Sequence, residues 1–490
     1  MAEFTIPLIV RGKVIASEPV SFTARRGEIT FKTPDVVQHL DKIILRDAHG
    51  LADLYTLSLD EIIDYLVEVG GRLSPERNPH IAQALEIAVL TSGQSRALLH
   101  KMYASMAHSL NRPFLTELIE QNIGAEHLER WSQRRLNDRD VWVRAFGART
   151  VHLNAGNGPA VATYALINGA ILRCDNIVKS PSNDPYTAAA IALTMIDVAP
   201  DHPVTKHMTV AYWKGGNEAF ERRLYKPTSI EKIVAWGGAA SMGHIRQHLE
   251  PGLDLIALDP KVSASIVGAE ALAGEAAMNE AAERLARDVG YFNQEGCLSS
   301  RIAYVVADPD DDAALARLNE FGCRVERAIR ELPATLSTPH PAFDPTLRAE
   351  IDGLRFSDDV RIIGCRASDG GVIVSQVSEA VDFSDRLMGR VVNIVPVATP
   401  EAAAAKVTVH TQTIGIYPAA LKTRIRDACL LRGAQRLTDL GCATFEGMAA
   451  PHDGMEIMRR MVRWGVMEEF DARVIEQGAG LIHSGGDVAA

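Results

Sequence analysis

Cys297 lies in a polar turn that could hold a reactive thiol. Residues 292–297 read FNQEGC, which places the cysteine directly after a glycine. Backbone N–H groups in such a turn favour the thiolate, the form of cysteine that attacks a carbonyl carbon. The alternative is a small buried hydrophobe, a common role for cysteine. If the thiol is reactive, the chemistry predicted here is covalent catalysis.

A run of small residues follows a predicted strand in the middle of the chain. Residues 233–236 read IVAW, and residues 237–243 read GGAASMG before a helical pattern begins. Exposed N–H groups at a helix start favour anions, so the segment is a candidate phosphate seat. It is not the G-x-G-x-x-G fingerprint, and an ordinary tight turn between strand and helix is the alternative.

Two polar residues stand at the boundaries of predicted elements. Asn157 precedes a Gly-Pro pair that suits a helix start. Its amide could donate to a developing oxyanion, or it could belong to a plain capping loop. Lys179 ends a predicted strand, where its ammonium could meet ribose or phosphate, or could simply be solvated.

The elements expected to position these residues alternate between strand and helix. After short strands near the N-terminus, residues 35–131 have a mainly helical pattern. The predicted elements that follow are strands at 141–143, 150–153, 176–179, 208–213, 231–236, 302–306, 360–363 and 391–397, and helices at 161–171, 188–195 and from about 312 to 329. This alternation predicts an α/β fold with parallel sheets and right-handed crossovers.

Composition narrows the function classes. The 490 residues predict about two to four domains. A net charge of −11 argues against nucleic acid as a partner. No secretion signal or membrane-spanning apolar run is evident, and the six cysteines lie far apart without a C-x-x-C pair. We expect reduced thiols, a cytoplasmic protein and no metal site, since the fifteen histidines show no H-E-x-x-H spacing.

The order of these segments resembles the aldehyde dehydrogenase superfamily over roughly residues 140–400. The closer resemblance, over nearly the whole chain, is to acyl-CoA reductases of the bioluminescence fatty acid reductase family. The segments that carry it are NGP at 157–159, KSP at 179–181, WGG at 236–238, SMG at 241–243, LDPK at 258–261, FNQEGC at 292–297, GIYP at 415–418 and APHDGM at 450–455.

The resemblance implies two parallel-sheet Rossmann-type domains plus a small β oligomerisation flap, and therefore a homo-oligomer. It places an N-terminal region and nicotinamide-binding domain in residues 1–275, with flap strands near 138–153. Residues 276–455 would form the catalytic domain, and residues 456–490 an oligomerisation segment and tail.

The resemblance also assigns roles by position. Cys297 matches the nucleophile, and Asn157 matches the amide of the oxyanion hole. Lys179 matches the lysine that meets the adenosine ribose, and two glycines match the turn beneath the pyrophosphate. The predicted cofactor-binding residues are Lys179, Ser182, Trp236, Gly238 and Gly243.

Departures from the superfamily pattern refine the prediction. Ala257 replaces the glutamate that activates water in hydrolytic members, so an acyl-enzyme should survive to exchange with CoA. Glu295 is near the thiol in sequence but is expected to point away from it. Ser182 replaces an acid found in NAD-selective members, which favours NADPH, with NADH also possible. The segment at 386–390 lacks the ribose-binding carboxylate.

The predicted function is reduction of an acyl-CoA or acyl-protein thioester to the aldehyde through an acyl group on Cys297. The resemblance implies a long fatty chain, with acyl-CoA, CoA and an acyl-protein synthetase as partners. One alternative is an aldehyde dehydrogenase that oxidises aldehyde to acid, against which Ala257 counts. The other is a catalytically silent binding module, against which Asn157, Lys179 and Cys297 count together.

Overall fold

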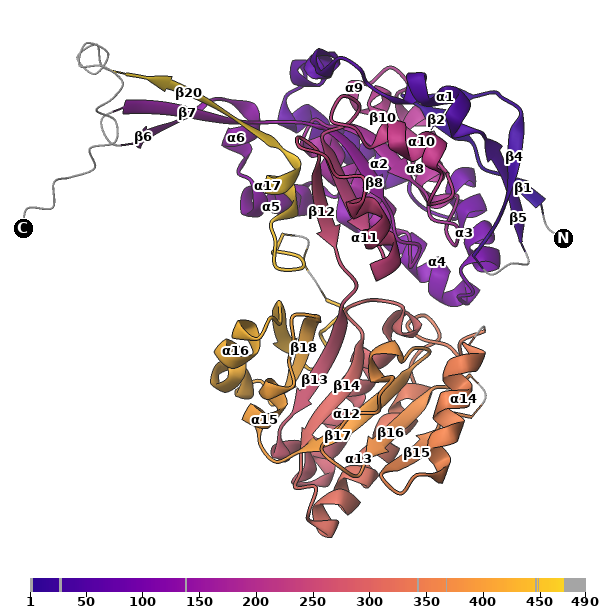
Figure 1. The fold of residues 1–490 in the computed structure, drawn as a ribbon, viewed down its shortest axis with the longest axis vertical. Helices are drawn as coiled ribbons and strands as arrows, with labels where there is room; N and C mark the ends of the chain where they lie inside the picture. The colour runs from indigo at the N-terminus through magenta and orange to yellow at the C-terminus, as the bar shows by residue number, and fades with distance from the viewer. Residues whose placement is uncertain are drawn as a thin grey trace, which may run out of the picture.

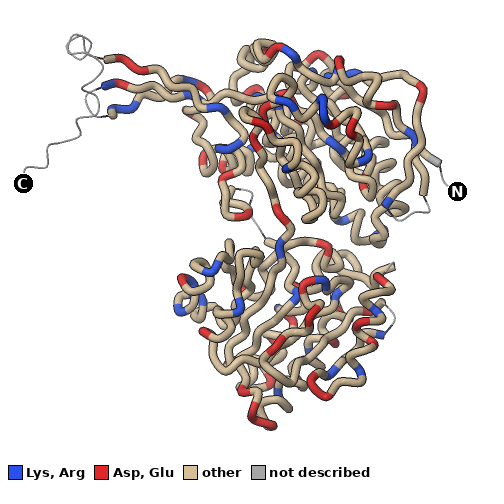
Figure 2. The backbone as a smooth tube through the Cα atoms, in the orientation of Figure 1, with Lys and Arg blue, Asp and Glu red and all other residues tan. Residues whose placement is uncertain are grey.

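Two seven-stranded sheets, one in each of two domains, dominate the computed structural model (Figure 1). The structure describes residues 3–25, 29–136, 139–341, 343–366, 368–445, 447 and 449–470. Most of the predicted tail therefore lies outside the described residues. No helix in the described part of the chain is both long enough and apolar enough to cross a membrane. Figure 2 shows acidic and basic residues interspersed along the backbone of both domains.

The first sheet is parallel except at one edge. Its order is β12 (Asp254–Leu258), β11 (Lys232–Trp236), β8 (Arg149–Leu153), β9 (Asp175–Lys179), β10 (Met208–Ala211), β2 (Leu8–Val10) and β3 (Lys13–Ile15). At that edge β2 pairs antiparallel with both of its neighbours, β10 and β3. The parallel strands are mostly buried, as expected when helices cover both faces.

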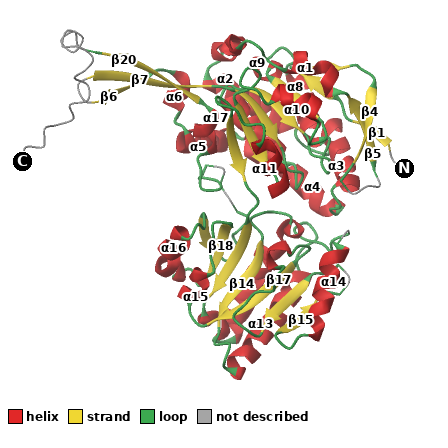
Figure 3. Cartoon of the chain, viewed as in Figure 1, coloured by secondary structure: helices red, strands yellow, loops and turns green. Residues whose placement is uncertain are grey.

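Helices cover both faces of the first sheet (Figure 3). One face packs against α2 (Leu59–Arg72), α3 (Pro79–Thr91), α4 (Arg96–Ser105), α5 (Arg112–Asn122), α7 (Ala160–Ile171) and α8 (Thr187–Val198). The other packs against α1 (Val36–Ile43), α10 (Glu218–Leu224) and α11 (Ala239–Arg246). The short helices α6 (Ala125–Glu129) and α9 (Pro203–Lys206) complete the domain. A capping box between Ser58 and Glu61 starts α2.

The second sheet repeats this plan. Its order is β15 (Val360–Gly364), β16 (Gly371–Ser375), β17 (Val391–Val397), β14 (Ser300–Val306), β13 (Val262–Val267), β18 (Thr411–Tyr417) and β19 (Arg436–Asp439), with only β15 antiparallel. The helices α12 (Glu275–Gly290) and α13 (Asp312–Arg330) cover one face, α15 (Pro400–Ala405) and α16 (Leu421–Leu431) cover the other, and α14 (Pro345–Gly353) packs near β16 and β17. The predicted α/β alternation is confirmed.

The chain passes between the sheets earlier than the predicted boundary at residue 275. The strand β13 already belongs to the second sheet, so the crossing lies between Leu258 and Val262. The three-residue connection has no change in composition that would mark a linker in the sequence.

Two three-stranded sheets lie outside the two main ones. β6 (Ser132–Leu136), β7 (Arg139–Phe146) and β20 (Arg463–Glu469) form a ribbon that projects from the first domain (Figure 1). The predicted flap at 138–153 thus covers two sheets, because the fully buried β8 is a central strand. β1 (Glu3–Thr5), β4 (Pro19–Thr23) and β5 (Thr30–Pro34) form the second small sheet. After β19 the chain returns through α17 (Ile457–Met461) to β20.

Candidate active site

The turn before Cys297 has an unusual backbone. Phe292, Asn293 and Gln294 are consecutive, and their φ angles are 52°, 54° and 66°. Residues with a Cβ avoid this left-handed region, and each such residue costs about 1–3 kcal/mol. Strain of this kind persists only where the surrounding structure fixes it, and it often does so at functional sites.

Asn293 ties this turn to its surroundings through a fully buried side chain. Its Nδ2 donates to Gln94 Oε1 at 2.7 Å, and its Oδ1 accepts from the backbone N–H of Thr338 at 2.8 Å. The Oδ1 also accepts from Ser337 Oγ at 3.2 Å. Gln94 belongs to the first domain, so this side chain connects the two domains across their boundary.

Gln294 fixes the turn to the second sheet. Its Nε2 donates to the carbonyls of Ser300 and Val391, both at 2.8 Å, and its Oε1 accepts from the Val391 N–H at 3.0 Å. Next to it, Ser263 Oγ donates to the Cys297 carbonyl at 2.6 Å. The half-buried Cys297 is therefore held against β13, β14 and β17.

Arg301 supplies a positive charge beside the cysteine. It lies at the start of β14, close enough for electrostatic interaction with Cys297 and Glu295. Burial lowers the pKa of the Arg301 guanidinium, and its Nη1 donates to the Asp385 carbonyl. A cation at this place stabilises a thiolate. Sequence reasoning missed Arg301, although its position four residues after the cysteine was a usable signal.

A cavity of about 560 Å³ lies between the domains and brings Asn157 near the cysteine turn. Asn157 is exposed and lines this cavity together with Glu295, which is two residues before Cys297. Asn183 Nδ2 donates to the Gly156 carbonyl at 2.8 Å and holds the loop. A Cβ on Gly156 would come within 1.9 Å of Asn183 Oδ1, so a larger residue there would displace the Asn183 side chain.

Glu295 lies two residues before Cys297 in the sequence, and it contributes a carboxylate to the lining of this cavity. Its Oε1 lies 3.0 Å from Nε2 of the fully buried His340. Ala257, at the position of the missing glutamate, lies in β12 and packs against the core beneath α10 and α11. Glu295 lines the same cavity as Asn157, and the expectation that it points away from the thiol stays a prediction.

Lys179 is a partly buried lysine at the end of β9 and is not simply solvated. Its Nζ lies 5.5 Å from the ring centre of Trp213 and 5.9 Å from that of Tyr212. Burial lowers the pKa of Lys179, and the nearby charge of Glu221 acts in the opposite direction. A lysine held in this way keeps a fixed position at the carboxyl edge of the sheet, where doubly wound folds bind ligands.

The start of α11 leaves room for an anion. Gly238 is the residue that caps the helix, it has no side-chain cap, and the first turn contains no acid. A Cβ on Gly238 or on Gly243 would point into open space. The N–H groups of this first turn have no partner within the helix, and the phosphate seat at this place stays a prediction.

Two buried polar side chains at the same edge lack partners. Among the described residues, neither amide atom of Asn154 nor the Oγ of Ser180 makes a hydrogen bond. They follow the paired residues Leu153 and Lys179 on neighbouring strands. Buried polar atoms are nearly always satisfied, so a polar cofactor fits this edge. Sequence reasoning missed both residues, although each directly follows a predicted strand. Ser182 lies two residues further on, half-buried in a turn.

Trp236 lies apart from Lys179. Residues of β11 alternate between faces, and Trp236 packs on the face opposite the one that Lys179 occupies. Its ring centre lies 5.3 Å from that of His452, and it lines a small cavity of about 50 Å³ with Tyr164 and Met455. The structure therefore does not bring all five predicted cofactor residues together.

The known proteins similar to this chain agree with this architecture. The long-chain acyl-protein thioester reductase of Vibrio harveyi is 26% identical over 469 residues, which cover 94% of this chain and 92% of that protein. The aldehyde dehydrogenase KauB from Pseudomonas aeruginosa superposes with a TM-score of 0.73 at 13% identity and covers 95% of this chain and 96% of that chain. The NADP-dependent glyceraldehyde-3-phosphate dehydrogenase from Bacillus halodurans C-125, solved with NADP, gives a TM-score of 0.70 at 11% identity, with 95% and 99% covered.

These likenesses confirm the predicted aldehyde dehydrogenase-like fold. The model of the family described as acyl-CoA reductase (LuxC) matches residues 54–464, well over half of the sequence. The chain therefore belongs to the acyl-CoA reductase (LuxC) family.

Proposed function

We propose that this protein reduces an acyl thioester to an aldehyde through an acyl group carried on Cys297. The observation that carries the proposal is the strained turn, whose buried side chains fix the cysteine within electrostatic range of Arg301. Membership of the acyl-CoA reductase family and the adjoining cavity with Asn157 support it.

The reaction begins when the Cys297 thiolate attacks the thioester carbonyl. The amide of Asn157 and the Cys297 N–H donate to the oxyanion, and the thiolate of CoA or of an acyl-protein leaves. A bound nicotinamide cofactor supplies the hydride that reduces the enzyme thioester. Asn157 stabilises the second tetrahedral oxyanion as well, and its collapse releases aldehyde and restores the Cys297 thiolate.

The cofactor is proposed to bind at the carboxyl edge of the first sheet. Lys179 would contact the adenosine ribose, and the unpartnered Asn154 and Ser180 would satisfy polar groups nearby. The α11 start at Gly238 and Gly243 would receive the pyrophosphate. Because Ser182 carries no charge to repel a 2′-phosphate, we propose a preference for NADPH over NADH.

The similar bacterial reductases are named for a long-chain acyl-protein thioester, which supports a long-chain acyl substrate. We propose that it arrives as acyl-CoA or on an acyl-protein synthetase. Residues up to 258 would form the cofactor-binding domain, and β13 to β19 the catalytic domain, after which the chain returns to the first domain. We also propose a homo-oligomer formed through the β6–β7–β20 ribbon. Its apolar residues Val466 and Met467 are 58% and 44% exposed, which is typical of a surface that a second copy covers.

The test is a panel of acyl-CoAs from acetyl to tetradecanoyl, plus benzoyl-CoA, assayed with NADPH and with NADH. We expect Cys297→Ser to lose nearly all activity, since an alcohol is a poor nucleophile at neutral pH. Cys323→Ser, which removes an exposed thiol on α13, is the matched control. Intact-mass measurement should show one acyl group on the wild type and none on Cys297→Ser. Full activity without any adduct would refute the proposal.

One observation favours a second function, oxidation of aldehyde to acid. Glu295 lines the cavity and is held by His340, so it could serve as a base that activates water. Rapid carboxylate release from aldehyde and NADP⁺ without CoA, lost in Glu295→Gln, would favour this function.

A further inference from the structure

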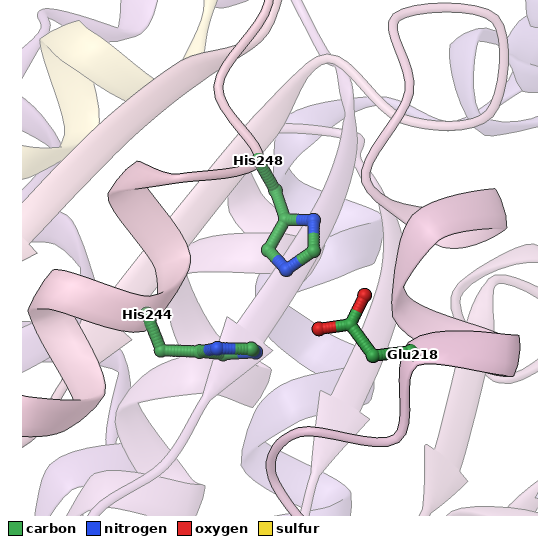
Figure 4. A group of neighbouring side chains, drawn as sticks. All are labelled: Glu218, His244 and His248. Carbon is green, nitrogen blue, oxygen red and sulfur yellow. The ribbon is translucent and has the colours of Figure 1, made fainter.

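Glu218, His244 and His248 form a cluster between α10 and the end of α11 in the first domain, and Figure 4 shows their side chains pointing toward one another. Glu218 begins α10, His244 lies near the end of α11, and His248 follows one helical turn later. One ligand atom from each of the three lies within 4.8 Å of the others. The histidines are four residues apart, so they project from the same side of the turn.

His244 already has the support that a metal-binding histidine needs. Its Nε2 lies 2.7 Å from Oε2 of Glu221, whose side chain is only 2% exposed. Glu221 is itself anchored by the indole N–H of Trp213 at 2.9 Å and the N–H of Gly216 at 3.0 Å. A carboxylate on one ring nitrogen fixes the imidazole and leaves the other, Nδ1, to bind a metal.

His248 contributes a buried nitrogen that needs a partner. Among the described residues its Nε2 makes no hydrogen bond, although the atom is buried. The ring packs edge-on against His244 at 4.9 Å between centres and lies 5.6 Å from the ring of Tyr225. Leaving such a nitrogen unsatisfied is costly, and a metal ion would remove that cost.

Glu218 adds the negative charge and is easily made available. Its carboxylate pairs with Arg222, but the two side chains are 50% and 71% exposed. Exposed ion pairs of this kind contribute little to stability, so a divalent cation can displace the guanidinium. The solvent side of the cluster also gives an ion a path to enter.

We infer that Glu218, His244 and His248 bind a Zn²⁺ ion. Two imidazoles and one carboxylate are a ligand set that zinc favours, and a water molecule would complete four-fold coordination. The ion would join α10 to α11. The carboxylate of Glu221, which holds His244, also acts on the charge of Lys179, on the side of the sheet proposed to bind the cofactor. This site goes beyond the proposed reduction and does not depend on it.

The test measures zinc binding to the tag-free full chain after treatment with a chelator. Isothermal titration calorimetry should give one Zn²⁺ per wild-type chain, and His248→Ala and Glu218→Gln should each weaken binding by at least about tenfold. His49→Ala, which removes an exposed histidine outside the cluster, should bind like the wild type. Titration with Co²⁺ should produce the visible absorption of four-coordinate cobalt in the wild type but not in His248→Ala.

Metal-free thermal unfolding of each variant checks that the fold is retained. Wild-type protein that takes up no zinc would overturn the inference. So would equal binding by wild type, His248→Ala and Glu218→Gln, because the ion would then lie elsewhere in the chain. Neither result would bear on acyl reduction, which the Cys297 experiments test separately.

Discussion

The carboxyl edge of the first sheet and the cysteine turn of the second sheet differ in how their polar groups are satisfied. At the first edge, Asn154 and Ser180 are buried without partners among the described residues, and the glycines of α11 face open space. In the turn, Asn293 and Gln294 are buried and fully engaged. A sheet edge that binds an exchangeable ligand leaves polar atoms free to form hydrogen bonds with that ligand. A turn that holds a reacting atom forms hydrogen bonds between its own polar atoms and the surrounding protein.

The largest effect should come from the residue that faces the turn across the cavity. Asn157→Ala removes an oxyanion donor and should lower kcat by about 10²–10³-fold. The KM for the nicotinamide cofactor should stay within a factor of two or so, because Asn157 is assigned to the acyl group. Steady-state kinetics with a saturating acyl-CoA measure both constants. A variant that raises only the cofactor KM would assign Asn157 to the first edge instead.

Loosening the turn itself should have the next largest effect. Gln294→Ala removes three hydrogen bonds and should lower kcat by about 10²-fold, since a displacement of about 1 Å can cost that much. The cofactor KM should not change. Alkylation of Cys297 by iodoacetamide should slow in parallel, and exposed Gln133→Ala should match wild type. Unchanged kcat in a folded Gln294→Ala protein would contradict the role of the turn.

The two domains should respond to acid in opposite directions. Burial lowers the pKa of His152, in β8, to about 4, and raises the pKa of Asp288, in α12, to about 6. The contribution of His152 is present above its unfolded pKa and is lost as pH falls toward 4. The contribution of Asp288 is complete below its unfolded pKa and is lost as pH rises through 6. Between pH 7 and pH 5 the first domain should lose about 2 kcal/mol of stability and the second should gain about 1 kcal/mol.

The five tryptophans make this difference measurable, because all of them lie outside residues 262–445. Urea unfolding followed by tryptophan fluorescence reports on the first domain, and its loss of stability at pH 5 should shrink in His152→Gln. Hydrogen exchange in β13 and β18 reports on the second domain, where Asp288→Asn should remove the gain. Parallel responses of the two domains would show that other groups dominate.

The smallest effect should come from a substitution at the carboxyl edge of the first sheet. Asn154→Ala should raise the cofactor KM by several-fold to about tenfold and leave kcat unchanged, because it removes one hydrogen-bonding partner of the bound cofactor. Cofactor titration by protein fluorescence gives the dissociation constant independently of turnover. An unchanged dissociation constant would mean that the unpartnered amide serves no ligand.

Strands and helices with a strong pattern were predictable from the sequence. β17 coincides with the predicted strand at 391–397, and α7 with the predicted helix at 161–171 within one residue. The buried β8 was assigned to the flap because a short apolar run does not reveal which sheet it joins. The domain boundary was missed for a similar reason, since the connection before β13 is too short to differ in composition.

The candidate site was only partly accessible to sequence reasoning. The order of the motifs around Cys297, Asn157 and Lys179 could be recognised in the sequence. Which other residues lie near these three depends on how the chain folds. Glu295 shares the cavity with Asn157, and Trp236 faces away from Lys179, because of geometry that spacing does not encode. The four-residue spacing of His244 and His248 was visible, but Glu218 lies 26 residues before His244 and only the packing of α10 on the sheet brings it close.

The hydrogen bond from Asn293 to Gln94 has a mechanical consequence. Its two ends belong to separate domains, so a movement that draws Gln94 away from the cysteine turn breaks this bond. The backbone carrying the thiol would then lose one of its restraints at the moment when substrate or product has room to pass. This single amide–amide contact therefore keeps the nucleophile rigid while it is formed, and must be lost when the domains separate at this point.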